Sequence, residues 1–421
     1  MTMIKTGLLN FLSVIIKVIT GLILNKIMAL YIGPAGYALA SQFQNGINFV
    51  TTFATGAITT GVTKYTAEYA NDDKKLSDLF KSTVLISSLS CLILSIMLFT
   101  LSDYISEQLL KSRTYSSVIR WFSITIFLFV ANLILISIVN GFKHFKKYVV
   151  INISGSITSL FFSGTLIYFL NLKGAFIAFA TNQSIVFFMT FFLVSRQSWM
   201  KFKYFIGFPK EYFFIKKLAQ YSLMAIVSAF CVIYMQIAIR DYIAAKFSWE
   251  QAGIWDGVWR ISSLYLMIVT VPLGVYYLPR LSELKTSKLI AKEIKLGYAY
   301  ILPLVIVASL CIFLLRDFII QLLFSKSFLP MNEIIGWQLI GDVFKIGSWL
   351  LSYLMLSKAL TKTYIITEIV TALLFLGLVH YLTASNGLIG VTQAYCLTYL
   401  VYWIMMIIIM SIYFKSVSKN E

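Results

Sequence analysis

The amino-acid sequence predicts an all-α polytopic membrane protein with 12 transmembrane helices arranged in two six-helix bundles. The chain of 421 residues is 59% hydrophobic and only 12% charged, too few charges to cover a soluble domain of this length. Its apolar residues form runs of about 20, the helix length that crosses a hydrocarbon layer about 30 Å thick. Short similarities also recur at a nearly constant spacing between the two halves of the chain.

The apolar runs define the predicted spans. They cover residues 8–30, 37–62, 82–102, 118–141, 149–170, 174–195, 218–239, 252–278, 297–315, 333–357, 364–382 and 387–413. The first run is too long for a cleaved signal peptide, contains Lys17 and Lys26, and has no small-residue cleavage site after it. We therefore predict that it is the first transmembrane helix.

The basic residues predict the orientation of the chain. Lys and Arg number 35 against 17 Asp and Glu, which gives a formal net charge of +18. With the N-terminus in the cytoplasm, 23 of these cations fall in cytoplasmic segments and seven in outward segments. Because positive residues collect on the cytoplasmic side, both termini are predicted to be cytoplasmic. The membrane accounts for these scattered cations better than a nucleic acid, which would need one soluble basic face.

The segment between spans six and seven predicts the domain organisation. Residues 196–217 form the longest connection, contain six basic residues and divide the spans six and six. We expect an N-terminal bundle in residues 1–195, a cytoplasmic linker in 196–217 and a C-terminal bundle in 218–421.

Local similarities across that linker predict an internal duplication. Leu101–Ile105 resembles Leu315–Ile319, and Trp121 corresponds to Trp337 at almost the same spacing along the chain. Six spans per half place both halves in the membrane with the same orientation. The predicted relation is therefore a pseudo-two-fold axis along the membrane normal, with a cavity between the halves, as in transporters.

Polar residues inside the first two spans are candidates for lining that cavity. Lys17 lies in mid-span on a polar stripe, whereas Lys26 faces the opposite side and fits a cavity role as well as a snorkelling one. Span two carries Gln42, Asn45 and Asn48, whose amides either bind substrate oxygens or join helices.

Charged residues in the second half are the other candidates. Asp256 and Arg260 are one turn apart in span eight, and this spacing fits either a structural pair or a gate. Asp342 and Lys345 share a face of span ten. Glu368 in span eleven has no partner within one turn, which makes it the candidate for ion coupling.

The sequence contains no motif for catalysis or for a metal. His144 and His380 lack metal-ligand spacing, no phosphate-binding loop occurs, and no segment outside the spans is long enough for a catalytic domain. We therefore expect no cofactor and no enzymatic activity. A cavity with excess lysine and amides suits a polar anionic substrate.

Several motifs resemble the Wzx family of flippases for polyprenyl-diphosphate-linked oligosaccharides. They are Gly33-Pro-Ala-Gly36, Gly61–Tyr65, Ser248-Trp249, Gly253–Trp255, Leu314–Phe318 and Trp337–Val343. The resemblance implies the fold of the multidrug and oligosaccharidyl-lipid exporters, a bacterial inner-membrane location, and an undecaprenyl-diphosphate oligosaccharide of the O-antigen type as substrate. It also implies the polymerase and chain-length regulator of the pathway as partners, with membrane lipid around the protein.

The same resemblance places a group of charged residues near the cavity. They are Lys17, Lys26, Lys64, Asp342, Lys345 and Glu368. Related cation-coupled exporters carry an acidic residue in their first helix where this chain has Lys17, a difference that favours an anionic ligand. Two alternatives stay open at this point: a cation-coupled multidrug antiporter of the same fold, and a membrane polysaccharide polymerase or ligase.

Overall fold

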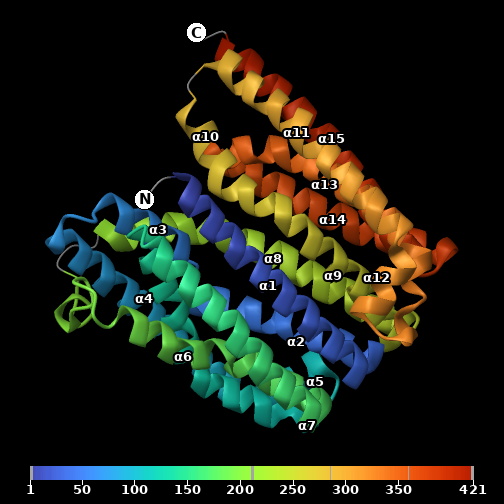
Figure 1. The fold of residues 1–421 in the computed structure, drawn as a ribbon, viewed down its shortest axis with the longest axis horizontal. Coiled ribbons are helices and arrows are strands. Elements are labelled where there is room, and N and C mark those ends of the chain that lie inside the picture. Colours follow the sequence, from blue (N-terminus) through green and yellow to red (C-terminus); the bar gives the residue numbers. More distant parts are fainter. Residues whose placement is uncertain (1–2, 210–212, 285, 359, 419–421) are drawn as a thin grey trace. The chain divides into compact units, whose positions relative to one another are not determined.

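The structure is a computed structural model that describes residues 3–209, 213–284, 286–358 and 360–418. Within these ranges the chain is helical, with short connections and no strand (Figure 1). It forms two compact units, Met1–Tyr234 and Met235–Glu421. The boundary between the units lies inside α8 (Phe213–Lys246), C-terminal to the predicted linker 196–217.

The first unit contains seven helices before α8 among its described residues. They are α1 (Met3–Tyr31), α2 (Gly33–Ala54), α3 (Thr59–Glu68), α4 (Asp73–Thr100), α5 (Ser102–Leu110), α6 (Ser116–Gly141) and α7 (Phe145–Val194). Short 3₁₀ turns lie at Arg113–Tyr115 and Phe202–Tyr204. The helices α6 and α7 pack against each other, and α1 packs on α7.

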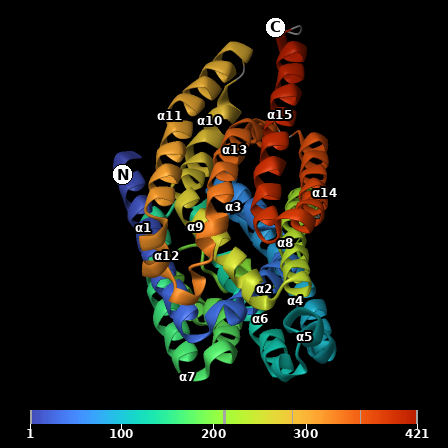
Figure 2. The same cartoon turned by 90° about the vertical axis from the view of Figure 1, so that its right-hand side faces the viewer.

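The second unit is built around α13. Its helices after α8 are α9 (Trp249–Pro272), α10 (Leu278–Glu283), α11 (Ser287–Leu314), α12 (Arg316–Leu323), α13 (Met331–Ser357), α14 (Thr361–Asn386) and α15 (Ile389–Ser418). A π-helical turn at Leu273–Tyr277 joins α9 to α10, and a 3₁₀ turn at Lys326–Phe328 precedes α13. The helix α13 lies against α9, α10, α11, α14 and α15 and so forms the centre of the unit (Figure 2).

All 12 predicted spans overlap helices, and the structure confirms the all-α membrane fold. Eight helices among the described residues are long and apolar enough to cross a membrane, and α7, with 50 residues, holds the predicted spans 149–170 and 174–195. One predicted span is broken: residues 37–62 form α2, a turn, and then α3. The turn contains Gly56 and Ala57 with φ of 62° and 53°, a left-handed backbone that ends the helix.

The chain folds back inside α7 at Asn171, which has φ of 49° and ψ of −129°. A Cβ on Gly174 would lie 1.9 Å from the carbonyl oxygen of Leu166, so the two arms of this helical hairpin touch through glycine. The second unit repeats the arrangement between α14 and α15. There Gly387 has φ of 59° and ψ of −142°, and a Cβ on Gly390 would lie 2.5 Å from the carbonyl oxygen of Leu382.

Other elements recur in the same order in both units, which supports the predicted duplication. The helices α4 and α11 have the same length, 28 residues, and start at Asp73 and Ser287. Each is followed at once by a short helix, α5 or α12, and then by a 3₁₀ turn and a long helix. In each unit the two long helices of this motif pack together, α4 on α6 and α11 on α13.

Candidate functional site

A buried carboxylate lies at the centre of the second unit. Asp342 on α13 has no exposed surface. The hydroxyl of Tyr265 from α9 donates to its Oδ2 at 2.8 Å, and the hydroxyl of Tyr395 from α15 donates to its Oδ1 at 2.7 Å. A carboxylate in an apolar interior is costly without such donors. Three helices therefore converge on one acidic side chain.

Lys345, one turn after Asp342, sits among four aromatic rings. Its Nζ lies 5.2 Å from the ring centroid of Trp259, 5.0 Å from Trp349, 5.7 Å from Tyr395 and 5.2 Å from Tyr399. We call Lys345 and these four residues the Lys345 box. Ring faces stabilise an ammonium without neutralising its charge, and the lysine is only half-buried. The rings of the box therefore leave the charge of the ammonium to be balanced by an anionic group.

Glu368 on α14 belongs to the same charged group. Its carboxylate interacts electrostatically with the Lys345 ammonium, and its side chain is half-buried. The structure thus brings together Asp342, Lys345 and Glu368, three residues singled out in the sequence. The carboxylate of span eleven therefore has an opposite charge within electrostatic range on another helix.

The predicted pair of Asp256 with Arg260 is wrong. Asp256 binds Arg240 of α8, with Nε to Oδ2 at 2.6 Å and a second nitrogen to Oδ1 at 2.7 Å. Both side chains are buried, at 5% and 2% exposure, whereas Arg260 is exposed. A planar guanidinium makes two parallel hydrogen bonds to a carboxylate facing it across a helix interface. This geometry joins α8 to α9.

Arg240 was missed as a partner because it stands at the end of a predicted span, where a basic residue usually marks the membrane surface. The first unit joins its first two helices at the corresponding place. There the hydroxyl of Tyr37 donates to Asn25, the residue that the repeat pairs with Arg240. A buried polar contact therefore joins the first two helices of each half.

The amides of α2 divide into two groups. Gln42 is fully buried, and its Nε2 donates to the carbonyl of Leu109 in α5 at 3.1 Å, so it joins two helices of the first unit. Asn48 is exposed and accepts a hydrogen bond of 3.2 Å from Gln44, while Asn45 is half-buried. The hydrogen bond of Gln42 therefore has a structural role between α2 and α5.

The three predicted lysines of the first unit differ in exposure. Lys17 on α1 and Lys64 on α3 are exposed, and Lys26 on α1 is half-buried. The Lys64 Nζ lies 5.4 Å from the ring centroid of Tyr65, and Lys217 lies 5.2 Å from the same ring. The substrate-binding roles of Lys17, Lys26 and Lys64 stay predictions.

The first unit also has a cavity of about 760 Å³ at the start of α4. Lysines and aspartates alternate along its wall, among them Asp73 and Lys75. Tyr204 hydrogen-bonds to Asp73, and this bond raises the pKa of the Tyr204 phenol. Both charge signs line the cavity, so its charges do not by themselves select an anion.

Close packing beside Asp342 leads to a test of the box geometry. A Cβ on Gly341 would lie 2.5 Å from a ring carbon of Tyr395, the residue that donates to Asp342. We expect Gly341→Ala to lower the free energy of unfolding by about 1–3 kcal/mol and to reduce transport, because the ring must move. Thermal unfolding in detergent measures the first effect. Gly377→Ala is the matched control, since a Cβ there meets nothing within 4 Å; equal losses in the two variants would contradict the expectation.

Comparisons with known proteins agree with this architecture. A family described as "Polysaccharide biosynthesis protein" matches residues 3–285. The lipid III flippase of Escherichia coli (strain K12) is 30% identical over 409 residues, 96% of this chain and 97% of that protein, and the lipid III flippase of Shigella flexneri matches equally well.

Solved structures show the fold. An inward-facing multidrug resistance MATE family transporter superposes with a TM-score of 0.80 at 14% identity, covering 96% of each chain. An outward-facing multidrug resistance MATE family transporter gives a TM-score of 0.68 at 13% identity, covering 97% of this chain and 96% of its own. With flippases among its relatives and transporters among its structural neighbours, the protein is a multi-pass membrane transporter, and the chain belongs to the polysaccharide biosynthesis protein family.

Proposed function

We propose that the protein is a flippase that moves undecaprenyl-diphosphate-linked oligosaccharide repeat units, of O-antigen or a similar surface glycan, across the bacterial inner membrane. The direction is from the cytoplasmic to the periplasmic leaflet, with both termini in the cytoplasm. The observation that carries this proposal is the 30% identity to a lipid III flippase over 96% of the chain. A match of that extent covers both halves of the protein.

The Lys345 box fits the head group of such a substrate. A diphosphate in hydrocarbon needs cations and hydrogen-bond donors to offset its lost hydration. The Lys345 ammonium provides charge, and Trp259, Trp349 and Tyr399 provide flat apolar faces against which a sugar ring packs. Lys17, Lys26 and Lys64 are the cations that we propose for the first unit.

Alternating access is the transport cycle that we propose, with the head group in a cationic cavity and the polyprenyl tail in lipid. Negative charge carried outward moves with an inside-negative membrane potential, which supplies about 2.3 kcal/mol per charge per 100 mV. Asp342 and Glu368 are the proposed ion-coupling groups, because substrate binding at Lys345 would withdraw the cation that balances them. We propose a gating role for Asp256 and substrate contacts for Arg260, Asn45 and Asn48.

Lys17 provides the direct test of the cationic cavity. We expect Lys17→Ala to abolish flipping, because its mid-span ammonium is exposed in the first unit and has no substitute on the same stripe of α1. The measurement is restoration of surface glycan in cells that lack their own flippase, with membrane insertion checked by immunoblot. Lys146→Ala, at an exposed lysine in the first turn of α7, is the matched control and should complement fully. Normal complementation by Lys17→Ala would refute the cationic cavity.

The same cells separate the proposal from a multidrug antiporter. An antiporter would protect cells against cationic drugs and would tolerate loss of Lys17, whereas a flippase would restore glycan and give no protection. The polymerase and chain-length regulator of the pathway are the partners that we propose, and copurification from membranes tests them. Failure to copurify would contradict the proposed partners but not the proposed flipping activity.

A further inference from the structure

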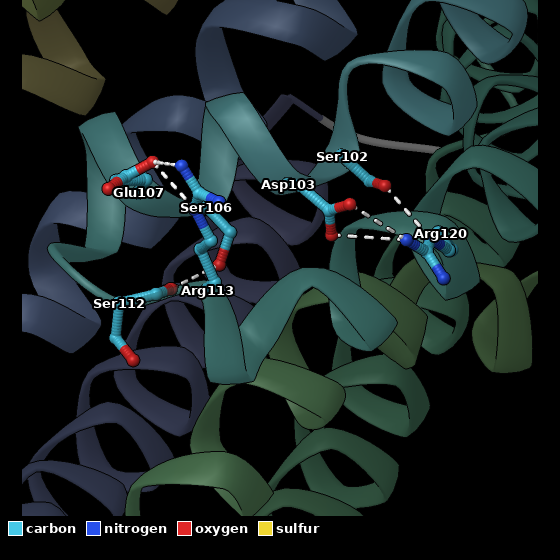
Figure 3. Close-up of polar contacts among 7 residues, drawn as sticks. All are labelled: Ser102, Asp103, Ser106, Glu107, Ser112, Arg113 and Arg120. Carbon is cyan, nitrogen blue, oxygen red and sulfur yellow. Dashed lines mark hydrogen bonds and ion pairs between the residues drawn. The ribbon is translucent and has the colours of Figure 1, made fainter.

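In each unit a short helix connects two long helices: α5 connects α4 to α6, and α12 connects α11 to α13. We call each connection a corner. In the first unit Arg120 of α6 closes the corner (Figure 3). One terminal nitrogen donates to both Asp103 oxygens at 3.0 and 3.2 Å, and Nε donates to Ser102 at 2.8 Å. Arg113 with Glu107, at 2.7 Å, holds the far end of α5 in the same view. The pair of Arg120 and Asp103 thus joins α6 to α5 at this corner.

The corresponding corner of the second unit has a different arrangement. The repeat pairs Asp103 with Asp317, and it pairs Arg120 with Gly336, just before the matching tryptophans. Asp317 accepts a hydrogen bond from Asn332 instead of from an arginine. With glycine at the place of the closing arginine, a groove of about 550 Å³ opens between α11 and α13. That volume lies within the roughly 300–1,000 Å³ of small-molecule sites.

The groove is apolar along its length and charged at one end. Its walls are Ile306, Leu310, Phe313, Trp337, Leu339, Ile340 and Val343, and its charged end carries Arg316, Asn332 and Glu333. Leu310 is 55% exposed and Trp337 is 42% exposed. Both lie on helices long and apolar enough to cross a membrane, which makes a membrane lipid the class of ligand to consider for this groove.

Two polar atoms at the charged end are unsatisfied. Arg316 stacks on the Phe313 ring at 4.4 Å and donates one terminal nitrogen to the Phe313 carbonyl at 2.9 Å. Its Nε is buried and has no hydrogen-bond partner among the described residues, and the same holds for Asn332 Oδ1. A shielded guanidinium nitrogen without an acceptor is unfavourable. The groove therefore offers a cation that needs an anionic oxygen.

We propose that this groove binds one phospholipid of the bilayer with a zwitterionic head group, a phosphatidylethanolamine. One acyl chain lies along the apolar wall, the phosphate accepts from Arg316, and the ammonium of the head group pairs with Glu333. Glu333 decides the head group, because its carboxylate at the charged end pairs with the ammonium of phosphatidylethanolamine, whereas an anionic lipid has no ammonium to offer it. A polyprenyl phosphate or diphosphate is disfavoured for the same reason.

Native mass spectrometry of the full-length protein, delipidated in detergent and titrated with phosphatidylethanolamine or phosphatidylglycerol, tests the proposal. We expect one tightly bound phosphatidylethanolamine per protein. Leu310→Trp, which fills the groove, and Arg316→Ala should each weaken it by about tenfold or more, the loss expected for a charged hydrogen bond. Glu333→Gln should abolish the preference over phosphatidylglycerol.

Ile96→Trp is the matched control, because the repeat pairs Ile96 of α4 with Leu310 and its side chain is 56% exposed. It should bind phosphatidylethanolamine like the unchanged protein, and size-exclusion profiles show whether each variant is folded. Equal binding in Leu310→Trp and Ile96→Trp would overturn the site. Equal affinity for phosphatidylglycerol, or displacement of the lipid by undecaprenyl phosphate at equal concentration, would overturn the assigned head group.

Discussion

Lys345→Ala is expected to reduce flipping of the lipid-linked oligosaccharide by roughly 10- to 100-fold while the protein stays folded and inserted. The estimate follows from the about 1.5–3 kcal/mol that a hydrogen bond to a charged group contributes. The box itself should persist without the ammonium, because Trp259 packs on Tyr395, with centroids 5.4 Å apart, and Tyr395 packs on Tyr399 at 4.8 Å.

Uptake of a fluorescent undecaprenyl-diphosphate oligosaccharide into the far leaflet of proteoliposomes measures this loss. Lys345→Arg keeps the cation and its affinity for ring faces, so it should retain more activity than the alanine variant. Lys326→Ala, a lysine in the turn before α13 and outside the box, serves as the matched control. Equal flipping by Lys345→Ala and the unchanged protein would exclude Lys345 from the substrate path.

Breaking the buried pair of Arg240 and Asp256 should give the largest loss of stability. We expect Arg240→Ala or Asp256→Ala alone to lower the free energy of unfolding by about 3–5 kcal/mol, because each leaves an uncompensated buried charge. The double change to leucine at both positions should recover much of the loss, since it removes both charges together. Thermal unfolding of purified protein in detergent reports these differences.

The control for that experiment is on the same helix. Arg260→Ala removes an exposed cation one turn from Asp256 and should change unfolding by no more than about 0.5 kcal/mol. A loss of stability from Arg260→Ala as large as that from Arg240→Ala would mean that the Asp256 carboxylate is stabilised by Arg260 of its own helix as much as by Arg240.

The helices were predictable because hydrophobic runs report membrane burial directly, but their interruptions were not. The apolar run 37–62 predicts one span. In the structure, the left-handed backbone at Gly56 and Ala57 divides this span into two helices. Local composition does not show this turn, since Ala57 is apolar and has no preference for positive φ. The turn depends on packing that joins distant residues: a Cβ on Gly56 would lie 2.6 Å from Ile86 of α4.

The candidate site was predictable only where its residues share a helix. The sequence indicates Asp342 and Lys345 because they share one helical face. It indicates Glu368 because this carboxylate has no partner within one turn of an apolar span. The rings of Trp259, Tyr395 and Tyr399 come from α9 and α15, and no spacing within one helix indicates that they surround the lysine. Arg240 was hidden for the same reason, because its partner depends on which helix lies alongside.

The hairpins at Asn171 and Gly387 bear on how the protein is made. Asn171 is the one non-helical residue inside α7, and Gly387 and Leu388 separate α14 from α15, with glycine at the point where the arms touch. So short a turn leaves few backbone groups without hydrogen bonds, which removes most of the penalty for moving it through hydrocarbon. During biosynthesis each hairpin is therefore suited to enter the bilayer as a pair, with no loop to translocate between its arms. Lengthening either turn by a polar insertion would disturb assembly before it disturbed transport.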